Sequence, residues 1–477
     1  MGRTEPILPL NTAKGKPGKP GRRASPPPPA TPKLTPKKAI TAIFLSLLAL
    51  SLLHRPVTHC YNGFPGYGKG QGLLSPEERA RNILRETPLI DGHVDFPMIL
   101  RFVYGNHIYN DNFTQPFERG ELPGHVDLQR LREGHSGGAF WSLFAPCPAN
   151  GSDFSDQNYA SSVQFTLDQI DVMTRLQELY PDDFSQKVDS SNALKAFQQG
   201  QFISPFGIEG LHQIGNSATN LRKFYELGTR YATLTHNCHN KFADAALLEN
   251  PIRKAEPLWG GVSPRGRRLI HEMNRIGMIV DLSHVSEDTM LDVLGNKSDW
   301  AGSKAPVIFS HSSAYSICPH PRNVKDHVLQ LVKERNSVVM VNISPDFISC
   351  VDNGNENGLP DFFPANSTRA QVVRHILHIG NLIGFDYVGI GTDFDGIMTV
   401  PEGFEDVSRY PDLVAELLKN GVSNEDAAKV VGGNVLRVWK DVDVVAAKMQ
   451  DIFEVPMEDE LEPLKFEARG DSTGLFR

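Results

Sequence analysis

The sequence predicts an α/β fold, a (β/α)8 TIM barrel in which eight parallel strands alternate with helices. The chain has 477 residues, enough for one large barrel with additional tails. Eight short apolar runs follow one another between residues 88 and 393, and amphipathic segments separate them. A doubly wound open sheet is the alternative, but no G-x-G-x-x-G follows the first run.

The eight runs are continuously apolar rather than alternating, as expected of strands that are covered on both faces. In chain order they are Pro88–His93, Gly138–Ala145, Pro205–Glu209, Tyr231–His236, Gly277–His284, Pro306–His311, Val338–Ser344 and Tyr387–Asp393.

The segments between these runs have helical periodicity. Within Arg265–Gly277 the apolar side chains fall on one stripe, and the final glycine can close the helix. Val324–Glu334 and Gln371–Leu382 have the same pattern. Ser423 and Asp426 form an S-x-x-D capping box that predicts a helix running towards Trp439.

The ends of the chain differ from the body. Residues 1–38 contain nine lysines and arginines, one acid and ten prolines, which predicts a disordered cytoplasmic tail. Residues 39–53 are apolar and uncharged, and we expect an N-terminal signal-anchor that spans the membrane and leaves the body extracellular or lumenal. A cleaved signal, giving a secreted protein, is the alternative. Residues 54–72 are predicted to be a linker, 73–456 the barrel domain and 457–477 a flexible tail.

Other features of the body agree with export. Four cysteines, Cys147, Cys238, Cys318 and Cys350, can form two disulfides, and spacing alone leaves three pairings open. Without the basic tail the net charge changes from −8 to −16, which argues against a nucleic-acid partner. N-glycosylation sequons, of which Asn342 is expected to be buried, occur at Asn112, Asn150, Asn296, Asn342 and Asn366.

Ionisable side chains recur where the predicted strands end. Because the carboxyl ends of barrel strands converge on one face, residues far apart in the sequence should meet there. One such histidine is usually structural, but a set without lysine or arginine is better explained by bound cations. The set is His93, Asp95, Glu209, His236, His284, His311 and Asp393.

Imidazole and carboxylate ligands favour zinc. His93 and Asp95 lie two residues apart and can bind one ion together, while Glu209 has two oxygens and can bridge two ions. His284 and His311 can complete the second site. Two zinc ions would share a hydroxide, which would be the nucleophile.

Several nearby residues are harder to assign. Asp281 either orients a metal ligand or faces the helix layer. Asp395 lies two residues beyond Asp393, and spacing cannot choose between them. Histidines expected on the surface or in loops are His125, His135, His212 and His271. The chain has no G-x-S-x-G motif, so a serine-nucleophile hydrolase has little support.

The motifs in chain order are I-D-G-H-V-D (90–95), G-I-E-G (207–210), L-T-H-N-C (234–238), D-L-S-H (281–284), F-S-H-S-S-A (309–314), P-R-N-V (321–324), V-N-I-S (341–344), G-T-D-F-D-G (391–396) and P-E-G-F-E-D-V (401–407). Together they resemble the membrane dipeptidase family, also called renal dipeptidase, over residues from about 75 to 445. The resemblance implies a metallo-dipeptidase. By motif it assigns His93 and Asp95 to one zinc, His284 and His311 to the other, and Glu209 to both.

The resemblance also implies roles towards the substrate. His236 would stabilise the developing oxyanion, and Arg322 would hold the free carboxylate of the dipeptide. Asp393 would take a proton from the attacking water and pass it to the leaving amine. The implied disulfides are Cys147–Cys238 and Cys318–Cys350, and members of the family commonly form homodimers.

Two other functions remain open at this stage. One is a metal-dependent amidohydrolase that acts on cyclic amides or β-lactams, and the other is a barrel that binds a partner without catalysis. The inserts Pro146–Asp156 and Asp352–Thr368 are expected to reshape the pocket mouth. Animal members often carry a C-terminal lipid anchor, but the last residues here lack the apolar tail that signals one, so an N-terminal anchor is expected.

Overall fold

Eight parallel strands form one sheet at the centre of the structure, a computed structural model that describes residues 74–297 and 299–460. Consecutive barrel strands pair side by side. In sheet order they are β1 (Leu89–Val94), β2 (Ser136–Ser142), β3 (Phe206–Glu209), β4 (Thr229–Thr233), β7 (Ile279–Asp281), β8 (Ile308–Phe309), β9 (Val338–Val341) and β12 (Val388–Ile390).

The ends of the first and last strands meet and close the barrel. The backbone N–H of Asp393 donates to the carbonyl of His93 at 3.0 Å. The buried carboxylate of Asp91 accepts hydrogen bonds from the backbone and the hydroxyl of Thr392 (2.9 and 2.6 Å) and from the hydroxyl of Tyr410 (2.7 Å). The predicted (β/α)8 fold is therefore confirmed, and the open-sheet alternative is wrong.

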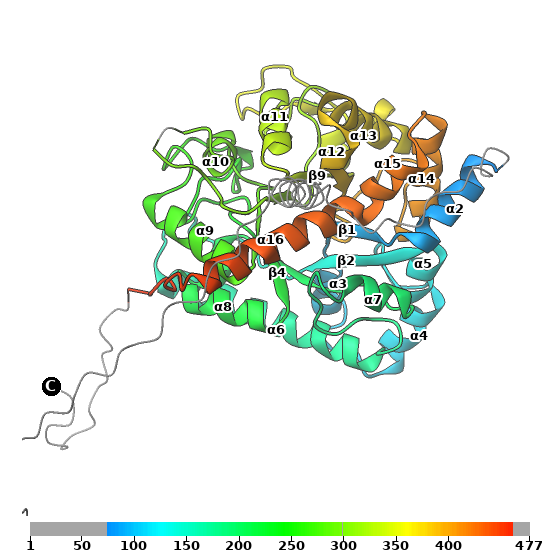
Figure 1. Cartoon of the computed structure of the whole chain (residues 1–477), viewed down its shortest axis with the longest axis horizontal. Helices are drawn as coiled ribbons and strands as arrows, with labels where there is room; N and C mark the ends of the chain where they lie inside the picture. The colour runs from blue at the N-terminus through cyan, green and yellow to red at the C-terminus, as the bar shows by residue number, and fades with distance from the viewer. Residues whose placement is uncertain (1–73, 298, 461–477) are drawn as a thin grey trace, which may run out of the picture. The chain divides into compact units, whose positions relative to one another are not determined.

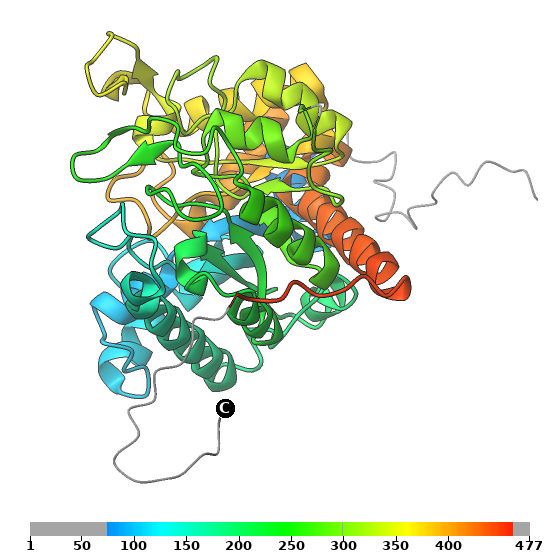
Figure 2. The ribbon, with the colours of Figure 1, turned by 90° about the vertical axis from the view of Figure 1, so that its left-hand side faces the viewer.

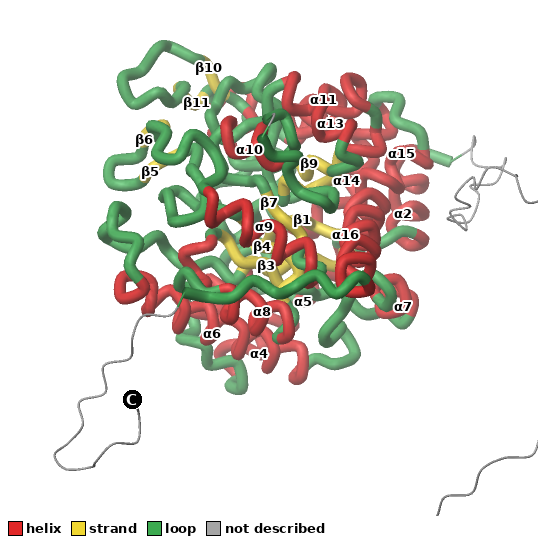
Figure 3. Tube along the Cα trace, turned by 60° about the vertical axis from the view of Figure 1, so that its left-hand side comes forward, coloured by secondary structure: helices red, strands yellow, loops and turns green. Residues whose placement is uncertain are grey.

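Helices surround the strands (Figures 1 and 3). Helix α9 shows how the sequence sets their limits: the Ser263 side chain accepts from the N–H of Gly266, and Gly277 ends the helix at a φ of 87°. The helices are α2 (Pro76–Glu86), α3 (Phe96–Phe102), α4 (Asp111–Arg119), α5 (Leu128–Glu133), α6 (Asp156–Leu179), α7 (Ala193–Gln198), α8 (Ala218–Glu226), α9 (Pro264–Ile276), α10 (Glu287–Val293), α11 (Asp326–Glu334), α12 (Pro345–Ile348), α13 (Arg369–Ile383), α14 (Tyr410–Lys419), α15 (Asn424–Ala428) and α16 (Asn434–Asp451).

Two separate groups of apolar side chains stabilise the barrel. The larger group lies between the strands and the surrounding helices. The smaller one combines strand residues such as Ile90, Phe140 and Tyr231 with Trp439 of α16. The Phe140 ring lies 5.4 Å from the rings of both Tyr231 and Trp439. Because successive strand residues point to opposite faces, this smaller group fills the barrel interior, and α16 covers one of its ends.

Each of the eight predicted runs overlaps a barrel strand, and most of the strands are shorter than the runs. His236 follows β4 by three residues, and His284 follows β7 by the same number. His236 and His284 therefore lie in the loops that follow these strands, whereas His93 and Glu209 lie within strands. In the loops the backbone is free to adopt other conformations, such as the positive φ of 65° at His284.

The helix predicted after Ser423 forms, with an interruption. Ser423 caps α15 by accepting from the N–H of Asp426 at 3.0 Å. A π-helical turn over Lys429–Gly433 then leads into α16. At this turn Gly432 approaches β1 so closely that a Cβ atom would lie 2.1 Å from the carbonyl oxygen of Pro88. The turn lets the backbone pack against the first strand.

Two short hairpins lie side by side at one edge of the barrel domain (Figures 2 and 3). One is formed by β5 (Leu247–Leu248) and β6 (Arg253–Lys254), and the other by β10 (Cys350–Val351) and β11 (Asp361–Phe362). The N–H of Lys254 donates to the carbonyl of Asn357 at 2.8 Å. The predicted insert after residue 352 therefore forms most of a hairpin that contacts a second one.

The predicted cytoplasmic tail, apolar segment and linker lie outside the described residues, as do residues 461–477. Among the residues that the structure describes, none of the helices has the length and apolar character needed to cross a bilayer. The start of the predicted C-terminal tail contacts the barrel domain. The N–H of Met457 donates to Glu272 at 3.1 Å, and Asp459 accepts from the N–H of Ala218 at 2.7 Å.

Candidate metal centre

The ends of the strands bring five of the predicted residues together. His93 lies in β1, Asp95 immediately precedes α3, and Glu209 is the last residue of β3. His284 and His311 follow β7 and β8. All five side chains are buried. Their nitrogen and oxygen atoms form two groups, each within 4.8 Å, and Glu209 belongs to both.

The first group contains His93, Asp95 and Glu209. Nε2 of His93 lies 3.1 Å from Oδ2 of Asp95 and 3.6 Å from Oε2 of Glu209. Neither this Nε2 nor Oδ1 of Asp95 has a hydrogen-bond partner among the described residues. Gly396 leaves room for this arrangement, since a Cβ there would lie 2.3 Å from Oδ2 of Asp95. Buried polar atoms without partners are costly, and a bound cation would satisfy them.

The second group contains Glu209, His284 and His311. Oε1 of Glu209 lies 2.8 Å from Nε2 of His284 and 3.4 Å from Nε2 of His311, and the two nitrogens are 2.9 Å apart. Burial holds the pKa of His284 and of His311 well below its usual range. Both rings are therefore neutral, which is the form that binds a metal.

The other ring nitrogens of two of these histidines have partners that fix the rings. Nδ1 of His93 lies 2.7 Å from the hydroxyl of Tyr231, and Nδ1 of His284 lies 2.9 Å from Oδ1 of Asn237. An Nδ1–H that donates to such a partner leaves the lone pair on Nε2. With the proton on Nδ1, each of the two rings would present the lone pair of Nε2 to a cation at the centre.

Asp281 supports the third histidine through a serine. Nδ1 of His311 lies 2.9 Å from Oγ of Ser310, which donates to Oδ2 of Asp281 at 2.6 Å. The same carboxylate accepts from the hydroxyl of Thr233 at 2.5 Å. Of the two interpretations that the sequence leaves for Asp281, the structure favours an orienting role.

The structure separates the two aspartates that spacing could not. Asp393 groups with His93 and His311, and its Oδ2 accepts from Nδ2 of Asn342 at 3.1 Å. Burial raises the pKa of Asp393 well above its usual range. Asp395 instead accepts from the N–H of His125 at 2.6 Å and lies 3.2 Å from the ring of the same residue. Asp393 therefore belongs to the centre, and Asp395 serves a neighbouring loop.

Arg322 supplies a buried positive charge. Its side chain is fully buried, and none of its three guanidinium nitrogens has a hydrogen-bond partner among the described residues. Burial lowers its pKa to about 10, so that it still carries its charge at neutral pH. A buried cation without a paired anion is unfavourable, so this geometry is suited to an anionic ligand.

His236 lies at the edge of the second group, where its ring centroid is 4.4 Å from that of His284. Its Nδ1 is 3.4 Å from a carboxylate oxygen of Glu249 and 3.7 Å from Sγ of Cys147. Cys238, two residues further along, is bonded to Cys147. The loop that carries His236 is therefore attached covalently to the loop after β2.

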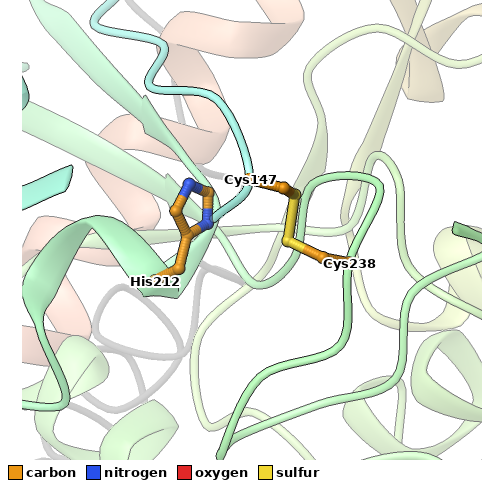
Figure 4. Close-up of side chains that lie close together, drawn as sticks. All are labelled: Cys147, His212 and Cys238. Carbon is orange, nitrogen blue, oxygen red and sulfur yellow. A yellow bond between two sulfur atoms is a disulfide. The ribbon is translucent and has the colours of Figure 1, made fainter. Parts of the chain in front are cut away.

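The two disulfides have the pairing that the resemblance implies. Cys147 is bonded to Cys238, and Cys318 to Cys350. Figure 4 shows His212 beside the first bond. Both sulfurs are used in that bond, so this cluster offers no thiolate to a metal. The expectation that His212 lies on the surface or in a loop is wrong, since it is buried in a 3-10 turn and its Nε2 lies 2.9 Å from the carbonyl of Ala145.

Sequence reasoning missed four polar residues that hold the centre in place: Tyr231, Asn237, Ser310 and Asn342. Each lies within four residues of a strand end, in or close to one of the motifs described above. Their position close to strand ends could therefore have indicated a supporting role at the centre, although their residue types alone did not.

The residues present fit zinc ions. Imidazole nitrogens and carboxylate oxygens are the ligands that zinc takes in proteins, and the two buried groups consist of these alone. His284 and Asp393 both have a positive φ, 65° and 68°. Such conformations cost roughly 1–3 kcal/mol each outside glycine and gather at functional sites. The local backbone is strained where the candidate ligands converge.

Comparisons with known proteins show which family the chain is similar to. A family model described as "Membrane dipeptidase (Peptidase family M19)" matches residues 77–452. Dipeptidase aclJ of Aspergillus oryzae is 43% identical over 84% of this chain and 88% of its own length. Dipeptidase tcpJ of Claviceps purpurea is 44% identical over 76% of this chain and 79% of its own length.

Two solved structures are also similar to this chain. A metallopeptidase from Rhodobacter sphaeroides, solved with a phosphinate mimic of the dipeptide L-Ala-D-Ala, is 25% identical with a TM-score of 0.61 over 75% of this chain and 99% of its own. The probable dipeptidase PvdM of Pseudomonas aeruginosa has a TM-score of 0.66 over 78% of this chain and 99% of its own. At 21% identity the second likeness concerns the fold alone.

Proposed function

The chain belongs to the membrane dipeptidase family of metallopeptidases, and from this premise we propose that it hydrolyses dipeptides with two zinc ions held at the centre described above. The observation that carries the proposal is the position of Glu209. One of its oxygens lies in a group with His93 and Asp95, and the other in a group with His284 and His311. A single carboxylate shared by two buried ligand groups is suited to a pair of cations.

Zinc ions held by these residues would lower the pKa of a shared water and polarise the scissile carbonyl. Side chains of the protein would bind the substrate, stabilise the developing charge and transfer the proton. Arg322 binds the free carboxylate of the dipeptide, and a guanidinium matches that group in shape and charge. His236, whose ring lies beside that of His284, would stabilise the negative charge that develops on the carbonyl oxygen.

Asp393 is the proposed proton carrier. Oδ2 of Asp393 accepts from Asn342, which leaves Oδ1 to take a proton from the attacking water. The same oxygen then gives the proton to the amine of the departing amino acid. Water is consumed, the peptide bond breaks, and two free amino acids leave.

The decisive experiment measures metal content together with turnover. We expect purified protein to contain two zinc ions per chain, in line with the two groups that share Glu209. A chelator should abolish hydrolysis of simple dipeptides, and added Zn²⁺ should restore it. Protein that binds no stoichiometric metal, or hydrolyses cyclic amides or β-lactams but not dipeptides, would contradict the proposal.

Substitution of Arg322 by alanine is expected to raise the KM for dipeptides about 30- to 150-fold, because the hydrogen bond of a charged group contributes ~2–3 kcal/mol. The kcat should change much less, since Arg322 lies outside both ligand groups. Steady-state kinetics on one dipeptide would test this. Arg322→Lys is the matched variant: it keeps the charge but loses the two-pronged geometry, so its KM should be intermediate. An unchanged KM for Arg322→Ala would remove this residue from the substrate site.

We further propose that the barrel domain is extracellular or lumenal and is anchored through residues 39–53. Two disulfides support export, because such bonds persist in oxidising compartments. Exposed sequon asparagines, at Asn112, Asn150, Asn296 and Asn366, support it as well, whereas Asn342 is buried. A homodimer remains a prediction from the family resemblance.

A further inference from the structure

The loop that carries Arg322 is fixed from both sides. Nδ2 of Asn323 donates to the carbonyl of Cys318 at 2.9 Å and to that of Phe347 at 2.8 Å. The Cys318–Cys350 disulfide joins this loop to the segment that follows α12. These bonds fix the backbone of Arg322, but none of them reaches the guanidinium. Another contact has to orient the end of this long side chain.

That contact is the ring of Phe347, which belongs to α12. The Cζ atom of Arg322 lies 5.2 Å from the centre of this ring. The face of an aromatic ring carries partial negative charge and attracts a guanidinium without forming a hydrogen bond. The nitrogens of Arg322 therefore stay available to a ligand while the group as a whole is held.

His320 completes the arrangement. Its ring centroid lies 4.5 Å from that of Phe347, and its Nδ1 accepts from the backbone N–H of Arg322 at 3.2 Å. Burial lowers the pKa of His320 to about 3, so the ring is neutral. A neutral imidazole packs against Phe347 without adding a second positive charge beside Arg322.

We propose that Phe347 is a positioning residue for substrate recognition, which holds the guanidinium of Arg322 in the orientation that receives the dipeptide's free carboxylate. This inference rests on the proposed function and adds a residue with no polar group to the site. A side chain oriented before the substrate arrives loses less conformational entropy on binding, so the ring contributes to affinity for carboxylate-bearing substrates. It should contribute nothing where the substrate lacks that carboxylate.

The test compares Phe347→Leu with Phe347→Tyr on a dipeptide and on the amide of the same dipeptide. Leucine keeps apolar packing but has no ring, and we expect the KM for the dipeptide to rise about three- to thirtyfold. The kcat and the zinc content should stay close to those of the unaltered protein. Tyrosine keeps the ring and should preserve the KM. Phe363→Leu is the matched control, because Phe363 is an exposed ring just after β11, and among the described residues the guanidinium of Arg322 lies over the ring of Phe347 instead.

Fluorinated phenylalanines at position 347 give a second measurement that does not depend on how well the leucine variant folds. Successive fluorine atoms weaken the negative face of the ring while largely keeping its shape, so the KM should rise stepwise with their number. The inference is overturned if the KM is insensitive to fluorination, or if Phe347→Leu raises the KM for the dipeptide and its amide equally. If the unaltered, zinc-loaded protein hydrolyses no dipeptide at all, the proposed function itself fails.

Discussion

Substitution of Glu209 by glutamine is expected to abolish dipeptide hydrolysis and to reduce the zinc content. Glu209 places one oxygen 2.8 Å from His284 and the other 3.6 Å from His93, so one change affects both ligand groups. Glutamine has nearly the same shape but no negative charge to offset two buried cations. Removing one partner from a buried charged cluster costs about 3–5 kcal/mol, which corresponds to a loss of roughly 10²- to 10⁴-fold. Zinc per chain and kcat/KM should fall together.

Glu226 offers a matched control for this charge change. It lies at the exposed end of α8 and pairs with Lys223 at 2.7 Å. A surface pair of this kind contributes little to stability. Glu226→Gln should therefore leave zinc binding and turnover unchanged. A Glu209→Gln protein that keeps two zinc ions and full activity would show that this carboxylate does not join the two groups.

Substitution of Asp393 by asparagine is expected to lower kcat by roughly 10²- to 10⁴-fold, the usual contribution of a general acid–base group. Asparagine keeps a contact with Asn342 but cannot carry a proton between water and the leaving amine. The five residues of the two ligand groups remain, so two zinc ions should still bind, and the KM should change little. Steady-state kinetics together with metal analysis separate these effects.

Asp395→Asn distinguishes the two neighbouring aspartates. Asp395 bonds to His125 and does not belong to any of the ligand groups around Glu209. Its substitution should lower the melting temperature, since a hydrogen bond of a charged group is weakened, and should leave kcat within about tenfold. If Asp395→Asn loses turnover and Asp393→Asn keeps it, the proton carrier has been assigned to the wrong residue.

The sequence was sufficient to predict the barrel and the residues that meet at its rim. The reason is geometric: parallel strands all end at one face, so a histidine at the end of one run and a glutamate at the end of another must lie near each other. His93 and Glu209, separated by more than a hundred positions, are 3.6 Å apart. The order of the apolar runs and the residues at their ends therefore predicted which side chains lie close together in the fold.

The supporting residues could not be recognised in the same way. Asn237, Ser310 and Asn342 have neutral side chains that are equally common in turns, so their residue type does not indicate a role. The burial of His212 depends on the loop after β2 folding across it, a contact between positions 67 residues apart. Such contacts arise from the packing of loops, for which the sequence has no periodic pattern.

The way the barrel closes has a consequence for how the protein is made. Asp91 accepts hydrogen bonds from Thr392 and Tyr410, which follow it by 301 and 319 residues. His93 and Asp95 flank this junction, so their surroundings are incomplete until the final strand has left the ribosome. A growing chain would therefore lack a finished cradle for both cations. If the proposed zinc centre forms, metal uptake would follow the folding of the last barrel strand, in the compartment where the full-length polypeptide completes its folding.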